Sequence, residues 1–207
     1  MISSPIFKKQ FLSVEECDYI IWLTESQPDW DPVSNSPYDN RMLDFFTSLQ
    51  YRRYSSSALQ KLSMQIYRKT QDVILKASKK ENVNVDFMAI VRMMPGDQTM
   101  SHNFNYPNAE RVGGCVIFLN DNFDGGLVRF VNTNKTITPH AGAAYVCGVQ
   151  ETDLHIATPV DGGVRYVIIS TWTTNPMSEF FNNQITKMTN YIHACDQAEQ
   201  PSVRQIN

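Results

Sequence analysis

Between Val83 and Trp172 the apolar residues of this chain recur at about every second position, and turns break the run into short pieces. This period is typical of β-strands, and it predicts strands at residues 85–93, 113–119, 127–131, 136–138, 143–148, 153–158 and 164–172. Turns such as Asp124-Gly125-Gly126 separate them. Many short strands with no helices between them favour a double-sheet roll, which closes its edges and leaves a mouth between the sheets.

Helices are predicted on both sides of this β-rich part. Ser13, with Glu16 three residues later, forms a capping box ahead of a helix at 14–26. Apolar residues at helical spacing predict a long helix at 55–79, and another helix is predicted at 178–194. Residues 27–39, rich in Pro, Asp, Asn and Ser, are predicted to be a loop.

The predicted fold class is therefore mainly β with flanking helices (α+β), a double-stranded β-helix or jelly roll. N-terminal helices support it, and a C-terminal helix follows it. A chain of 207 residues with 42% apolar residues fits one such domain. We expect this domain to span residues 1–174 and a helical extension with a tail to span residues 175–207.

Composition narrows the classes of partner and compartment. A formal net charge of −3 gives no reason to expect general nucleic-acid binding. No apolar run approaches the roughly 20 residues of a membrane helix, and the N-terminus lacks the pattern of a signal peptide, so a cytoplasmic protein is expected. The cysteines show no Cys-x-x-Cys spacing, which indicates buried free thiols rather than a zinc site or disulfides.

Two histidines are the candidate ligands of a functional site. His102 and His155 each lie where an extended run meets a turn, a position from which a sheet can aim a side chain into an enclosed space. Arg165 follows His155 by ten residues and begins an alternating strand. His140 is expected on the surface, and His193 on a polar face of the last helix.

Several motifs accompany these residues in chain order. They are the glycine-containing loop that leads from Arg92 to His102, Leu119-Asn120 with Gly125-Gly126, Pro139-His-Ala-Gly142, and His155 with Arg165. Over about residues 5–174 the chain resembles the iron(II) and 2-oxoglutarate-dependent oxygenases of the prolyl 4-hydroxylase type, especially the small stand-alone forms of phages and bacteria. The resemblance also suggests a short strand near residues 40–46 and a lid role for the loop at 27–39.

The resemblance implies roles for individual residues. His102 and His155 would bind iron, and Arg165 would pair with the distal carboxylate of 2-oxoglutarate. The family's third metal ligand, an Asp, falls on Phe104, which has no lone pair to donate. A family tyrosine that contacts the co-substrate falls on Met93. Asp153 is the nearby carboxylate that could replace the missing ligand, whereas Asn103 and Asn105 are expected to point away from the face that His102 uses.

These departures leave three hypotheses open. The first is a degenerate or weakly active oxygenase that hydroxylates a prolyl residue or another peptide-borne or small substrate, with Fe(II) and 2-oxoglutarate as cofactors if it is active and none if it is not. The second is a non-catalytic binding or structural module, for example a phage neck, tail or capsid-associated protein located in the virion, with oligomer or assembly contacts. The third is a cupin-type roll that binds another metal through the same histidines.

Overall fold

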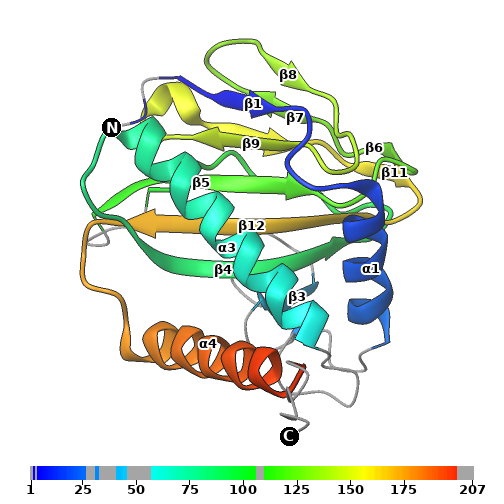
Figure 1. The fold of residues 1–207 in the computed structure, drawn as a ribbon. Coiled ribbons are helices and arrows are strands. Elements are labelled where there is room, and N and C mark those ends of the chain that lie inside the picture. Colours follow the sequence, from blue (N-terminus) through cyan, green and yellow to red (C-terminus); the bar gives the residue numbers. More distant parts are fainter. Residues whose placement is uncertain are drawn as a thin grey trace, which may run out of the picture.

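The computed structural model describes residues 2, 4–26, 31–32, 41–45, 57–105 and 110–199. Most of the predicted loop and lid at 27–39, and the tail from residue 200, lie outside these residues. The described chain forms two antiparallel sheets that face each other, with helices on the outside of the larger one (Figure 1). The predicted mainly β roll with flanking helices is therefore confirmed.

The larger sheet has seven strands in the order β1-β9-β5-β12-β4-β3-β2. The smaller sheet has the order β10-β7-β8, and a short two-stranded ribbon joins β11 to β6. The strand bounds in the larger sheet are Ile6–Lys8 (β1), Asp31–Pro32 (β2), Arg41–Asp44 (β3), Asn84–Met93 (β4), Arg111–Phe118 (β5), Ala144–Cys147 (β9) and Arg165–Thr173 (β12). The others are Asp124–Gly125 (β6), Val128–Phe130 (β7), Thr136–Ile137 (β8), His155–Ala157 (β10) and Val160–Gly162 (β11).

Strand β12 lies in the middle of the larger sheet, and all nine of its residues are buried. Successive side chains point to opposite faces of a sheet. Val167 and Ile169 accordingly pack between the two sheets, whereas Ile168 and Trp172 pack beneath the helices. The larger sheet thus separates two apolar cores, and the candidate site belongs to the core between the sheets.

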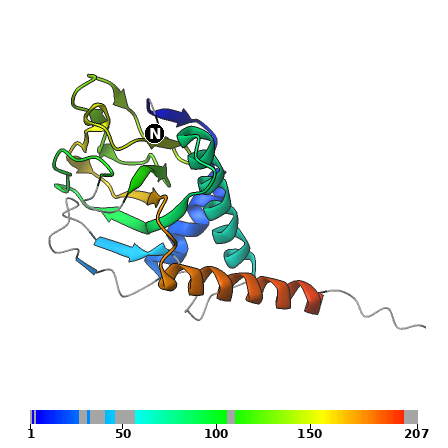
Figure 2. The ribbon, with the colours of Figure 1, turned by 90° about the vertical axis from the view of Figure 1, so that its left-hand side faces the viewer.

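Among the described helices, α1 (Val14–Glu25) and α3 (Ser57–Ser78) lie on the outer face of the larger sheet, and α4 (Glu179–Glu199) packs against α3 (Figure 1 and Figure 2). Helix α1 begins at the predicted capping box, in which the Glu16 N–H donates to Ser13 Oγ and the Ser13 N–H donates to the Glu16 carboxylate. Helix α3 crosses the sheet, and Phe181 and Met188 of α4 are buried in the core beneath the helices. Figure 2 shows α4 reaching out beyond the sheets.

Some predicted boundaries were wrong. The strand predicted at 153–158 is shorter than expected. It is β10, which begins at His155, because residues Glu151–Asp153 form a 3-10 turn. The last helix runs to Glu199 rather than ending at residue 194. The short strands β2, β6 and β11 were not predicted, because Asp, Gly and Pro within them are typical of turns and loops, and β2 lies within the predicted loop at 27–39.

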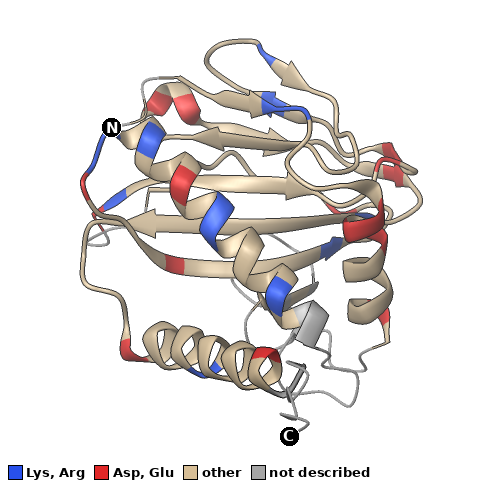
Figure 3. Ribbon diagram, in the orientation of Figure 1, with Lys and Arg blue, Asp and Glu red and all other residues tan. Residues whose placement is uncertain are grey.

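Charged residues lie mainly on the helices and toward the ends of the strands, as Figure 3 shows. Cys17, Cys115 and Cys147 are buried free thiols, as predicted, and Cys195 is a half-buried one. Within the described ranges, none of the helices contains a stretch long and apolar enough to cross a membrane.

Candidate active site

His102 and His155 face each other across neighbouring extended segments. The His102 N–H donates to the carbonyl of His155 at 3.0 Å, and the His155 N–H donates to the carbonyl of His102 at 2.8 Å. Residues paired directly across antiparallel segments have their side chains on the same face. The centroids of the two imidazole rings accordingly lie 4.5 Å apart.

The hydrogen bonds of the two imidazoles define which ring nitrogen carries the proton. Nδ1 of His102 lies 2.8 Å from the carbonyl oxygen of Met100, and Nδ1 of His155 lies 2.8 Å from that of Asp153. A carbonyl oxygen only accepts, so each Nδ1 must donate its hydrogen. The lone pair of each neutral ring is therefore on Nε2, which is the arrangement of a metal-binding histidine whose other nitrogen is held by a backbone carbonyl.

Burial keeps both imidazoles neutral. It lowers the pKa of His102 from its ordinary 6.5, and together with the neighbouring His102 it lowers the pKa of His155 to about 3. Aromatic rings surround His155, with the ring centroids of Phe104, Phe130 and Tyr145 at 5.4, 5.5 and 5.7 Å. Such surroundings disfavour the protonated form, and a neutral imidazole is the form that binds a metal.

Both histidines line one small cavity between the two sheets, and Arg165 lines it as well. Its volume is about 20 Å³, which is enough for roughly one water-sized group. The wall residues come from both sheets and from the segment before His102: Val91, Met93, Thr99, His102, Val116, Val128, Tyr145, His155, Ala157, Arg165 and Ile169. The structure thus brings together the three residues that the sequence singled out.

Arg165 is the first residue of β12, and only 4% of its surface is exposed. Its Nη1 donates to the sulfur of Met93, its partner on β4, at 2.6 Å. Its guanidinium carbon also lies 5.6 Å from the centroid of the Phe118 ring, within the range of a cation–π contact. Arg165 is therefore a buried cation in the same cavity as the imidazoles.

Asn120 and Gly126 determine where Arg165 lies. The Asn120 amide donates to the carbonyl of Val164 at 2.7 Å, and its oxygen accepts the Tyr166 N–H at 2.8 Å, so it binds the backbone on both sides of Arg165. Gly126 has a φ of +59°, and a Cβ there would stand 2.9 Å from Cδ of Arg165. The Leu-Asn and Gly-Gly motifs therefore orient and accommodate the arginine.

Phe104 fills the space beside His155. It is 2% exposed, and its ring packs against Gly114 of β5 so closely that a Cβ at Gly114 would stand 2.5 to 2.7 Å from three of the ring carbons. The absence of a side chain at Gly114 thus creates the slot that the benzyl ring occupies. We call this space above Gly114 the Phe104 slot.

No carboxylate of the described residues completes a metal site with the histidines. Within the described ranges there is no group of three or more His, Cys, Asp or Glu residues that could bind a metal ion. The Asp153 carboxylate accepts the Gln150 N–H at 3.0 Å within the 3-10 turn, and Asp153 does not line the cavity. The Asn103 amide donates to the carbonyls of Val149 and Gln150, which agrees with the prediction that it points away.

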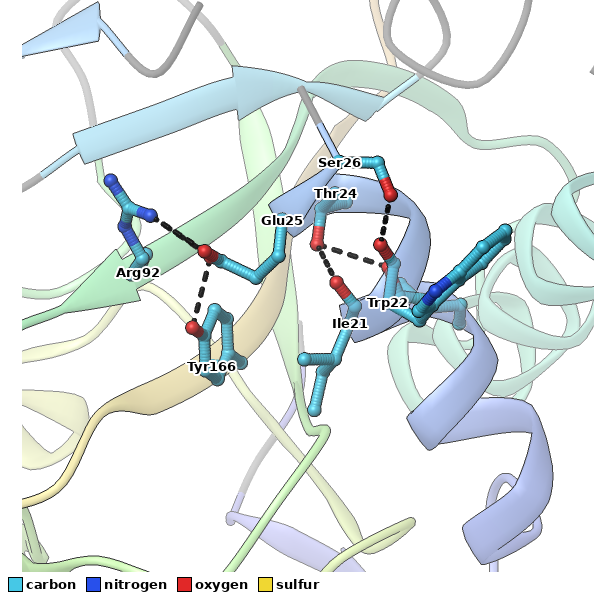
Figure 4. A network of polar contacts seen from close by, with 8 residues as sticks. Ile21, Trp22, Thr24, Glu25, Ser26, Arg92 and Tyr166 are labelled. Carbon is cyan, nitrogen blue, oxygen red and sulfur yellow. Dashed lines mark hydrogen bonds and ion pairs between the residues drawn. The ribbon is translucent and has the colours of Figure 1, made fainter. Parts of the chain in front are cut away.

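A polar cluster lies on the opposite face of the strands that carry Arg165 and Met93 (Figure 4). Arg92 contacts both carboxylate oxygens of Glu25 at 2.9 and 3.0 Å, and the Tyr166 hydroxyl donates to Glu25 at 2.9 Å. Burial and the Glu25 carboxylate raise the pKa of Tyr166 to about 12. Because these contacts join the end of α1 to β4 and β12, they fix the strand ends behind the arginine.

The sequence did not single out two of the cavity residues, Thr99 and Tyr145. The Thr99 hydroxyl accepts the Ala157 N–H at 2.7 Å and so binds the segment before His102 to β10. Tyr145 lies in β9, and Ala143 just before the strand and Cys147 at its end face the same core at alternate positions. The period of two indicates this face, but it does not indicate that a tyrosine there reaches the histidines.

Comparisons with known proteins give the fold but no family by sequence. No protein-family model matches the chain, and no curated protein does. Among solved structures, the viral collagen prolyl hydroxylase of Paramecium bursaria Chlorella virus-1, in a complex with 2OG, matches with a TM-score of 0.62 and 16% identity over 81% of this chain and 94% of that chain.

Two other solved structures have the same fold. A prolyl-4-hydroxylase of Pseudomonas putida matches with a TM-score of 0.61 and 14% identity over 83% of this chain and 93% of that chain. A prolyl hydroxylase of Trichoplax adhaerens, in complex with a peptide fragment of the hypoxia inducible factor oxygen degradation domain, also matches. The TM-score is 0.62, with 13% identity over 88% of this chain and 86% of that chain. The chain therefore has the fold of prolyl 4-hydroxylase-like 2-oxoglutarate oxygenases.

Proposed function

We propose that this protein is an oxygenase-fold protein of the prolyl 4-hydroxylase type whose iron-dependent activity is lost or weak. The observation that carries the proposal is the composition of one cavity, which two neutral imidazoles and a guanidinium line while the Phe104 ring fills the space beside His155. The imidazoles and the guanidinium are the groups that such an oxygenase needs for iron and for 2-oxoglutarate.

The residues present do not fit Fe(II) as a complete site. Non-haem iron of this class takes two histidines and one carboxylate. His102 and His155 supply the two nitrogens, but the residue two positions after His102 is Phe104, and no carboxylate of the described residues replaces it. We therefore assign no reaction step through iron, and we attribute the proposed loss of activity to Phe104.

Arg165 is the group that we propose for binding 2-oxoglutarate. Its planar guanidinium suits a carboxylate, which it can bind through two parallel hydrogen bonds. However, Arg165 contacts the sulfur of Met93, and the cavity measures only about 20 Å³. A five-carbon dicarboxylate would therefore have to displace Met93, which predicts weak binding.

For the substrate, we propose a prolyl residue or a similar group within a peptide, if the protein retains activity. The support is the fold, which the chain shares with prolyl hydroxylases, one of them solved with a peptide fragment. We further propose that residues 1–174 form the oxygenase-like domain and that residues 175–207 are an extension whose helix α4 packs on α3.

Anaerobic titration with Fe(II) and 2-oxoglutarate tests the proposal. The wild-type protein should give little or no visible charge-transfer band. The variant Phe104→Asp should acquire the band, since Gly114 leaves space beside the introduced carboxylate. Phe104→Asn is the matched control, because it has the same shape without the charge and should stay without a band.

Two outcomes would contradict the proposal. A strong band in the wild-type protein would mean that a third ligand lies elsewhere in the chain. A folded Phe104→Asp protein that gives no band would mean that position 104 does not face the metal-binding nitrogens.

A second candidate function is a non-catalytic binding module. The packing of Phe104 against Gly114 favours it, because the ring occupies the slot as a core residue does and leaves room for only a water-sized group. A wild-type protein that binds neither Fe(II) nor 2-oxoglutarate would support this function. A location in the cytoplasm, or in the virion of a phage, stays a prediction from the sequence.

A further inference from the structure

A cavity of about 650 Å³ opens at the rim of the roll, between β1, an edge strand of the larger sheet, and β8, an edge strand of the smaller one. Phe7 lines it from β1, and Thr136 and Ile137 line it from β8. Lys9, Gln10, Thr138 and His140 complete its polar lining. We call this cavity the β1–β8 groove. None of its lining residues lines the cavity of the two histidines.

We propose that the β1–β8 groove binds an extended acidic segment of a partner protein, which adds as a strand to one of the two sheet edges. The volume of the groove lies in the range of about 300 to 1,000 Å³ that is typical of ligand sites. Binding of this kind depends on backbone hydrogen bonds for affinity and on alternate side chains for specificity.

The strand edges supply the backbone groups for this pairing. Within the described part of the chain, β1 has β9 as its only strand neighbour, and β8 has only β7. An edge strand offers a row of backbone N–H and C=O groups to an incoming strand. A segment of about four residues, roughly 13 Å long when extended, would run along either edge.

The side chains of the groove predict the pattern of the bound segment. Phe7 is 39% exposed, Ile137 is half-buried, and both line the groove. Because alternate side chains of a strand point the same way, every second residue of the segment should be apolar and contact these two. The residues between them should point outward.

The charges around the groove indicate an acidic segment. Lys8 ends β1, Lys9 lines the groove, and Lys135 precedes β8, and all three are exposed. No carboxylate of the described residues forms an ion pair with any of them. In Figure 3 the ribbon is blue at the end of β1 and in the turn that leads to β8. This basic edge is local, since the whole chain has a net charge of −3.

The same charges argue against a second copy of this chain as the occupant. Pairing two copies through β1 would bring the lysines of both copies together, and lysines on an edge strand oppose such pairing. A partner that carries glutamate or aspartate between its apolar residues turns this repulsion into attraction. We therefore choose an acidic partner segment over self-association.

Fluorescence anisotropy with a labelled eight-residue peptide of alternating glutamate and valine tests this proposal. The peptide should bind the full-length protein saturably, and more weakly at high salt. A peptide of alternating lysine and valine should not bind. The acidic peptide methylated at every backbone nitrogen should bind at least about tenfold more weakly, because neither of its edges can then donate hydrogen bonds to a strand edge.

Two protein variants locate the binding. Lys9→Glu should weaken binding by about tenfold, because it places a like charge against the peptide. Lys80→Glu is the matched control, because it makes the same change of charge at an exposed lysine that does not line the groove. It should leave the affinity within roughly twofold of the wild-type value, which excludes an effect of net charge alone.

Each of the following results would overturn the proposal. They are no saturable binding of the acidic peptide below about 1 mM, equal weakening by Lys9→Glu and Lys80→Glu, and no effect of backbone methylation. Sedimentation analysis provides one more, since self-association that Lys9→Glu changes would identify a second copy as the occupant. None of these readouts involves iron or 2-oxoglutarate.

Discussion

Replacing Gly114 and Phe104 singly and together measures whether the Phe104 slot exists as described. A Cβ at Gly114 would stand 2.5 to 2.7 Å from three ring carbons of Phe104, far inside ordinary contact distance, and the ring is almost fully buried. Gly114→Ala should therefore overpack the core between the sheets. Phe104→Ala should leave a cavity, and the double variant should place the new methyl group in that cavity.

The magnitudes follow from the kind of defect. Overpacking a core costs about 1 to 3 kcal/mol, and removing a buried phenylalanine side chain costs about 3 to 5 kcal/mol. In the double variant the clash at Gly114 disappears, because the Phe104 ring that caused it is gone. Its free energy of unfolding should therefore fall by less than the sum of the single effects, with a coupling of about 1 to 3 kcal/mol.

Urea unfolding, followed by circular dichroism, provides the four stabilities. Phe45→Ala is the matched control, because Phe45 is fully buried in the core beneath the helices, on the other side of the larger sheet. When Phe45→Ala is combined with Gly114→Ala, the two changes in the free energy of unfolding should add within about 0.5 kcal/mol. Additivity of the Gly114 and Phe104 changes to the same degree would refute the packing that we describe.

Two other perturbations test the site and one tests the fold. The metal-free protein should lose stability as the pH falls below about 6.5, because the pKa of His155 is lowered from 6.5 to about 3 in the folded state, so that this group takes up a proton only on unfolding. The contribution is absent above pH 6.5, where the histidine is neutral in both states, and the loss should reach about 2 kcal/mol at pH 5. Urea midpoints in EDTA measure it, and His155→Gln should flatten the profile. Asn120→Ala should cost about 1 to 3 kcal/mol of unfolding free energy, because it leaves the Tyr166 N–H and the Val164 carbonyl without its amide. A change below about 0.5 kcal/mol in the urea midpoint analysis would mean that Asn120 does not hold the backbone around Arg165. Ser13→Ala should cost about 1 kcal/mol through loss of the α1 cap, seen as a lower melting temperature, and an unchanged temperature would contradict the capping box.

The fold could be predicted in large part because its signals are local. The alternation between Val83 and Trp172 predicted the long strands β4, β5 and β12, and the capping box predicted the start of α1. Strand β6 escaped prediction, because its two residues, Asp124 and Gly125, are typical of a turn. Asp153, the last residue of the 3-10 turn Glu151–Asp153, was mistaken for the start of a strand, because one turn of three residues has no period of its own.

The site could be predicted only as a set of residues. The resemblance singled out His102, His155 and Arg165, and their roles as ligands stay predictions. Tyr145 of the same cavity was missed, because a tyrosine at an alternating position does not differ, in sequence, from any other core residue. The hydrogen bond from Tyr166 to Glu25 was also missed, because it joins a strand to the end of a helix far away in the sequence.

The amino-acid sequence by itself determined the period of the strands, the start of α1 and the absence of a carboxylate two residues after His102, because each depends on neighbouring residues alone. Only the tertiary structure decided that two imidazoles and a guanidinium share one cavity and that Gly114 makes room for Phe104. The physical reason is strand register. A shift of one residue in the pairing of β10 or β12 would turn these side chains to the other face, and the packing of both cores selects the register that is observed.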